Sequence, residues 1–215
     1  MITQPWNRAA LAVTLVALAA PAAWAARTSP SSVPQTEAPR ATPAEQAASE
    51  LADGERQLDK AAAAQADGKA DKARKVYERA AKSFRRSAEL APTAAAYNGL
   101  GYALRKTGDY DAALEAYDRA IQLQPGFAQA IEYRAEAYLA LGRLDDVRQA
   151  YMQLFPTARA QADELLAAVN AWLAAGQTAD VPSEDLAEFT AWAKERSELA
   201  GQTASLAGDG PSRNW

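Results

Sequence analysis

Apolar residues recur at helical intervals along most of this chain, and the pattern is clearest between residues 97 and 125. Two apolar sets lie on either side of a polar break at residues 107–109. They comprise Tyr97, Leu100, Gly101 and Leu104, and then Tyr110, Ala113, Leu114, Tyr117, Ala120 and Ile121. Members recur every three or four residues, so each set occupies one face of an α-helix. Pro125 ends the pattern, since proline disfavours helical geometry in the residue before it. The stretch therefore predicts two amphipathic helices joined by a short turn.

This pair of helices resembles a tetratricopeptide repeat. The first helix of that family has an aromatic residue with Leu-Gly three and four residues later, as at Tyr97, Leu100 and Gly101. The turn and second helix have a characteristic order of Gly, Tyr, Ala, aromatic, Ala and Pro. Here these are Gly108, Tyr110, Ala113, Tyr117, Ala120 and Pro125. The resemblance implies an all-α fold, a short solenoid of antiparallel helix pairs, and a clear repeat over residues 93–126.

A related unit precedes the clear repeat, over residues 44–92. Thr42 and Glu45 have the spacing of a capping box, so a helix is expected from there to about residue 66, with Gly54 as a weak point. In the second helix, Phe84 follows Tyr77 by seven residues, which keeps both side chains on one face. The proline that ends the clear repeat has no early counterpart here. We therefore expect the second helix to be longer by one heptad, either as a ledge that overhangs the array or as simple variation in helix length.

A degenerate repeat is predicted over residues 127–157. Gly108 to Gly142 and Tyr117 to Tyr151 are both separated by 34 residues, which is the period of the family. Arg134 stands where the family has leucine. The second helix is expected to end early, at residues 155–156, because Pro156 arrives before its usual place.

Residues 158–200 are expected to form a helix pair that caps the last apolar face of the solenoid. Thr157 is expected to cap a helix over residues 158–175, which Gly176 ends. After a loop at residues 177–181, Ser183 is expected to cap a last helix that ends at Gly201. Its inward side chains would be Leu186, Phe189, Trp192, Ala193 and Leu199. Residues 201–215 form a Gly/Ser tail that we expect to be disordered.

The N-terminal residues 1–25 have the features of a secretory signal peptide. Arg8 precedes an apolar run, Pro21 breaks it, and residues 23–25 form an Ala-Trp-Ala cleavage signal. We expect export across the inner membrane, contact with the membrane only during export, and a periplasmic product in a Gram-negative source. The alternative is an uncleaved anchor, for which the run is short of the roughly 20 residues that a span needs. Residues 26–43 are rich in proline and are expected to form a flexible leader.

The composition removes several classes of function. The chain has 215 residues, a net charge of −4, and neither cysteine nor histidine. Disulfides, Cys/His zinc sites and histidine-based catalysis are therefore excluded. The negative charge does not suggest a nucleic-acid partner. We expect no metal, no cofactor and no enzymatic activity, since no constellation of catalytic groups is visible.

The family resemblance implies a concave groove lined by the first helix of each pair. Carried over residue by residue, the groove comprises Asn98, Tyr102, Arg105 and Lys106 in the clear repeat and Gln129, Glu132, Tyr133 and Glu136 in the next. An amide and an aromatic ring, as at Asn98 and Tyr102, suit contacts with a peptide backbone. The same two residues stand where chaperone-tail-binding members have lysine and asparagine, so that subclass is not expected. The alternative is that these side chains are merely solvated.

Two functions follow from the sequence. The first is an exported adaptor or scaffold that binds a protein segment in this groove and supports assembly of an envelope complex. The alternative is a structural module without a peptide ligand that associates with itself, for example as a homodimer, through the long helix at residues 73–91 or the C-terminal pair.

Overall fold

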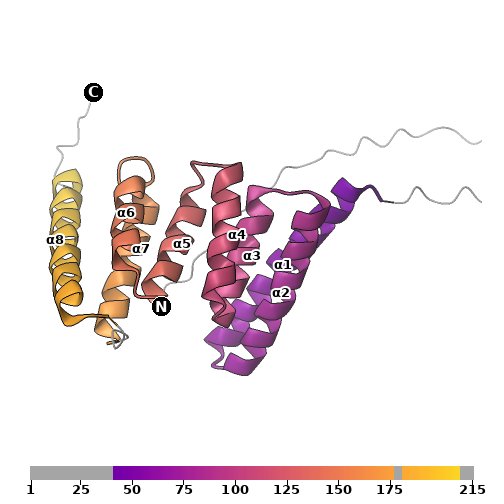
Figure 1. The fold of residues 1–215 in the computed structure, drawn as a ribbon, viewed down its shortest axis with the longest axis horizontal. Coiled ribbons are helices and arrows are strands. Elements are labelled where there is room, and N and C mark those ends of the chain that lie inside the picture. The colour runs from indigo at the N-terminus through magenta and orange to yellow at the C-terminus, as the bar shows by residue number, and fades with distance from the viewer. Residues whose placement is uncertain (1–40, 177–180, 209–215) are drawn as a thin grey trace, which may run out of the picture. The chain divides into compact units, whose positions relative to one another are not determined.

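The computed structural model describes residues 41–176 and 181–208, and the regular structure in these residues is helical throughout (Figure 1). Neighbouring helices are packed in chain order as antiparallel pairs, and the first helices of successive pairs also touch one another. The all-α prediction is confirmed. The helices are α1 Pro43–Ala66, α2 Ala70–Leu90, α3 Ala94–Thr107, α4 Tyr110–Leu123, α5 Ala128–Ala140, α6 Leu144–Leu154, α7 Arg159–Ala174 and α8 Ser183–Gly208.

The start of α1 is fixed by the predicted capping box. The Thr42 hydroxyl accepts a hydrogen bond from the backbone N–H of Glu45 at 3.2 Å, and the Thr42 N–H donates to the Glu45 carboxylate at 2.7 Å. This reciprocal pair satisfies two backbone donors that a helix start otherwise leaves open. Pro43 occupies the first helical position, where its missing N–H costs nothing.

The second helix of the first pair has the expected extra heptad, since α2 has 21 residues and α4 has 14. The extension does not overhang as a free ledge, because α1 is also long and covers it. The buried Ser87 hydroxyl donates to the Ala47 carbonyl of α1 at 2.9 Å. The Phe84 ring lies against Gly54 of α1 and Gly99 of α3, where a Cβ atom would come within 2.7 Å and 2.5 Å of it. Gly54 is thus a packing position, and its interpretation as a weak point was wrong.

Four glycines end the first helix of each pair with a left-handed backbone. Gly68, Gly108, Gly142 and Gly176 have φ between 65° and 87°, a region that side chains with a Cβ rarely adopt. The 34-residue interval from Gly108 to Gly142 recurs from Gly142 to Gly176. The α7–α8 pair therefore continues the repeat register at its turn, which the sequence analysis did not recognise.

Four expectations for the C-terminal pair were wrong. The residue before α7 is Ala158, which has no side chain able to cap, so Thr157 is not the cap. Ser183 is the first residue of α8 and lies inside the helix. Gly201 does not end α8, because a glycine in open space can keep the helical backbone at a cost of only about 1 kcal/mol relative to alanine. Leu199 is 41% exposed and does not face inward.

The predicted signal peptide, most of the leader, the loop at residues 177–180 and the last seven residues lie outside the described residues. Within the described ranges, no helix is both long and apolar enough to span a bilayer.

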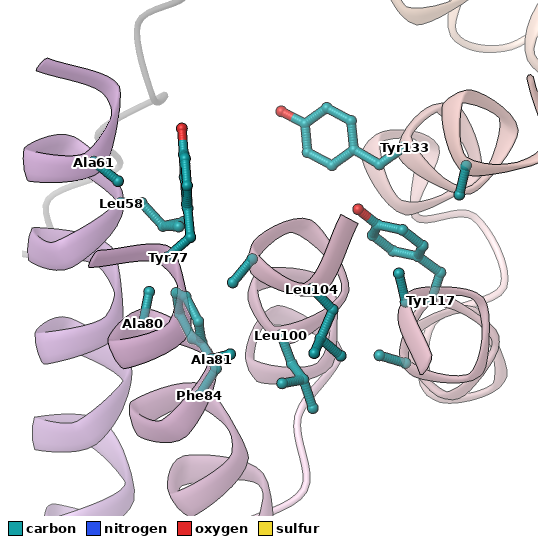
Figure 2. Packing of buried hydrophobic residues seen from close by; sticks show 14 of the residues in the cluster. Leu58, Ala61, Tyr77, Ala80, Ala81, Phe84, Leu100, Leu104, Tyr117 and Tyr133 are labelled. Atoms are coloured by element: carbon teal, nitrogen blue, oxygen red, sulfur yellow. The ribbon is translucent and has the colours of Figure 1, made fainter. Parts of the chain in front are cut away.

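The buried side chains form two clusters that meet near Ile121 and Tyr138. The first cluster is formed by side chains of the five helices α1 to α5. Figure 2 shows its larger members, among them Leu58, Phe84, Leu100 and Tyr117. The second joins α5 and α6 to α7 and α8, with Leu165, Val169 and Phe189 fully buried. Tyr151 of α6 contacts Trp192 of α8 edge-on at 5.4 Å.

Candidate protein-binding site

The eight predicted groove residues come together on the adjoining faces of α3 and α5. The Asn98 amide donates to the Gln129 side chain at 3.3 Å, and the Gln129 amide donates to the Tyr133 hydroxyl at 3.2 Å. Arg105 of α3 forms an ion pair with Glu136 of α5. The rings of Tyr102 and Tyr133 lie 5.1 Å apart, centre to centre. We refer to this surface as the α3–α5 face.

Two tyrosines from the second helices complete an aromatic row. Tyr77 of α2 lies 6.3 Å from Tyr102, and Tyr117 of α4 lies 6.3 Å from Tyr133. Figure 2 shows Tyr77 and Tyr117 on opposite sides of Leu100 and Leu104, with the hydroxyl end of Tyr77 directed away from these leucines. The apolar pattern in the sequence predicts only a packing role for Tyr77 and Tyr117. The two tyrosines occupy matching positions in successive repeats. This match is the feature of the sequence that could have shown that both rings lie beside the same face.

Arg105 connects the two helices and is not an open groove cation. Its side chain is 10% exposed, and its guanidinium lies 5.3 Å from the centre of the Tyr102 ring and 5.4 Å from that of Tyr133. Burial raises the pKa of Tyr117, and the nearby positive charge of Arg105 opposes that rise. Reversing the charge at Arg105 would therefore break the contact between α3 and α5, which makes it a poor test of binding.

The predicted groove residue Glu132 is buried, with 3% of its surface exposed. Burial raises the pKa of its carboxyl to about 9, and the neighbouring carboxylates of Glu136 and Glu164 act in the same direction. These effects favour the protonated, neutral form of Glu132. The burial of Glu132 could not be predicted from the sequence, because Glu164 comes from α7 and the burial depends on the packing of three helices.

Tyr102, Lys106, Gln129 and Glu136 are half-buried and form the accessible part of the α3–α5 face. The Lys106 ammonium lies 5.4 Å from the centre of the Tyr102 ring. Burial and the charge of Arg105 lower the pKa of Lys106. Beside them, the Oδ1 atom of the buried Asn98 makes no hydrogen bond. The face thus presents an aromatic ring, a cation and a carboxylate, which suit recognition of a peptide.

A shallow hollow of about 320 Å³ lies elsewhere, at the start of α6. Its lining charges pair with each other, as Arg143 does with Asp146 at 2.8 Å and Arg148 with Asp145 at 3.3 Å. In the described part of the chain, no three acidic side chains are grouped so that they could hold a metal ion.

Two family models of the tetratricopeptide repeat match the chain, one over residues 56–125 and the other over residues 100–163. Together they cover residues 56–163, from the middle of α1 into the start of α7. The chain belongs to the tetratricopeptide repeat family. A search of curated proteins finds no match to it. Tetratricopeptide repeats support a general role as a scaffold for protein–protein interactions, and proteins of this family are generally not enzymes.

Arg134 of α5 departs from the tetratricopeptide repeat pattern, which has leucine at this position. Its guanidinium donates to Asp118 of α4 at 2.6 Å and lies 5.7 Å from the centre of the Tyr138 ring. The contact between successive repeats is thus made by an ion pair and a cation–π contact where other repeats use an apolar side chain.

Proposed function

We propose that this tetratricopeptide repeat protein is an exported adaptor that binds a segment of a protein partner on the α3–α5 face and supports assembly of an envelope complex. The observation that carries the proposal is the accessible edge of this face, where the Lys106 ammonium lies 5.4 Å from the centre of the Tyr102 ring. A carboxylate or carbonyl oxygen of a bound peptide would accept a hydrogen bond from Lys106.

Crosslinking at Ala95 tests the proposal. Ala95 is exposed and lies one turn before Asn98 on α3. A photoreactive phenylalanine derivative at this position is expected to crosslink a defined partner in the producing organism. Lys106→Glu is expected to weaken the crosslinked band by about tenfold or more, because it replaces the cation at the open edge with an anion. The measurement is the band intensity on a denaturing gel.

Arg119→Glu is the matched control. It makes the same charge change on the exposed surface of α4, away from the α3–α5 face. It should leave the band unchanged, and both variants should keep the melting temperature of the parent. A band that survives Lys106→Glu at full intensity would place the partner on another surface.

Export rests on the pattern in residues 1–25, and mass spectrometry tests it. The mature protein recovered from the envelope fraction is expected to begin at Ala26, because the Ala-Trp-Ala signal directs cleavage after Ala25. Ala25→Arg is expected to leave residues 1–25 attached and to hold the protein at the membrane. Recovery of an unprocessed wild-type chain would instead support the anchor.

A further inference from the structure

The exposed face of α2 carries a continuous basic stripe. Its members follow one another at intervals of 3, 4, 3 and 4 residues, so they form a single line along the helix. All are exposed, and they are Lys72, Lys75, Arg79, Lys82 and Arg86. The line spans 14 residues, which is about 21 Å of helix. The heptad that lengthens α2 adds the last member.

This stripe contrasts with the charge of the rest of the chain. α2 has seven basic and three acidic residues, a net charge of +4, whereas the whole chain carries −4. The remaining residues therefore carry −8. The acidic residues Glu78 and Glu89 lie beside the stripe, and Glu89 is 3.4 Å from Arg86 in an exposed ion pair. Such pairs are weak and exchange readily.

The last helix, α8, carries an acidic stripe of the same length. Its members are Glu184, Glu188, Glu195 and Glu198, all exposed. Their intervals of 4, 7 and 3 residues place them on one face of the helix, with Ala191 completing the 4, 3, 4, 3 order. This stripe also spans 14 residues. Glu195 has an exposed ion-pair partner in Arg196, at 3.2 Å.

Both stripes face away from the packed interior. In α2 the buried side chains, among them Tyr77, Phe84 and Ser87, occupy the opposite side of the helix. In α8 the buried Phe189 and Ala193 do the same. α1 and α2 begin the row of helices and α8 ends it (Figure 1).

We propose that copies of this chain associate head to tail, with α2 of one copy packed antiparallel along α8 of the next. Read in reverse, the α8 intervals reproduce those of α2. The alignment places Lys72 opposite Glu198, Lys75 opposite Glu195, Lys82 opposite Glu188 and Arg86 opposite Glu184, with Arg79 opposite Ala191. The interface joins two different surfaces, so each copy keeps one free stripe and the assembly can grow.

Other occupants fit the α2 stripe less well. Insertion into a membrane surface uses exposed apolar side chains, and none of the exposed large hydrophobic residues in the described part of the chain belongs to α2. A long polyanion such as duplex nucleic acid would also meet the net −8 of the remaining residues. The acidic stripe of a second copy matches the basic one in length, spacing and sign. The association does not depend on the α3–α5 face.

Charge exchange between the stripes tests the proposal, with the full chain and sedimentation velocity as the measurement. The wild-type protein is expected to form concentration-dependent assemblies at about 50 mM salt and to dissociate at about 500 mM, where charges are screened. Lys72→Glu with Lys82→Glu, and separately Glu188→Lys with Glu198→Lys, should each weaken association by about tenfold or more. Mixing the two variants should restore association, because the acidic side chains introduced into α2 of one variant then face the basic side chains introduced into α8 of the other.

Lys60→Glu with Arg119→Glu is the matched control. It changes the net charge as much as the α2 variant does, at exposed sites outside both stripes, and it should associate like the wild type. Wild-type protein that stays monomeric at low salt would overturn the proposal, as would a mixture that stays monomeric. Binding of the monomer to anionic vesicles or to poly-glutamate, lost on reversal of the α2 stripe, would assign the stripe to a membrane or to an acidic partner instead.

Discussion

Gly99→Ala is expected to destabilise the protein by about 2 kcal/mol, within the range of roughly 1–3 kcal/mol found for overpacked cores. The added Cβ would lie 2.5–2.7 Å from three carbons of the Phe84 ring. The ring cannot retreat, because it is 1% exposed and Gly54 bounds its other side. A change from glycine to alanine in an unobstructed helix normally stabilises it by up to about 1 kcal/mol. Destabilisation by Gly99→Ala would therefore show that the added Cβ clashes with the packed ring. Urea unfolding at fixed pH measures it.

Two comparisons isolate the role of the ring. Gly201→Ala, in the exposed part of α8 where a Cβ meets nothing within 4 Å, should be neutral or slightly stabilising. In a Phe84→Leu background, Gly99→Ala should lose most of its cost, since the flat ring that needs both glycines is gone. If Gly99→Ala stabilises the wild-type chain as Gly201→Ala does, then α2 does not hold Phe84 between α1 and α3.

Glu132→Gln is expected to make the protein less sensitive to alkaline pH. The folded chain holds the Glu132 proton up to about pH 9, whereas the ordinary value is 4.5, at which the unfolded chain releases it. The stabilisation is therefore fully present below about pH 4.5 and is lost as the pH rises toward 9. Glutamine resembles the protonated carboxyl and does not titrate. Each unit of displaced pKa corresponds to about 1.4 kcal/mol, so the difference at pH 9 should exceed that amount.

The measurement is the free energy of unfolding of both proteins between pH 5 and 9. The two curves should lie close together near pH 5 and diverge above it, with the variant more stable. Titrating groups distant from Glu132 affect both proteins alike, so the difference reports on Glu132 and on the Glu136 carboxylate that interacts with it. Glu115→Gln is the control, because Glu115 is exposed on α4. A constant difference across the pH range would show that Glu132 is ionised in the folded state.

The sequence predicted which residues lie at the candidate site, but not which of them are buried or how they are charged. The family resemblance placed Asn98, Tyr102 and Arg105 in one groove, and it placed Glu136 in the same groove on the next repeat. The same reasoning treated Arg105 and Glu132 as free charges. It could not foresee that Tyr133 of α5 adds a second ring beside Arg105, or that α7 brings Glu164 toward Glu132, because these contacts join different helices.

The sequence by itself determined the helices, the turns and the family. These features are local. An apolar period of three to four residues can be recognised within a single helix, and the capping box at Thr42 and the turn glycines act within a few residues. Only the tertiary structure decided how the long α2 is used and why Gly54 and Gly99 are glycines. The physical reason is that burial and close approach depend on which side chains meet across helices: Phe84 needs two glycines from two other helices, and no local pattern records that requirement.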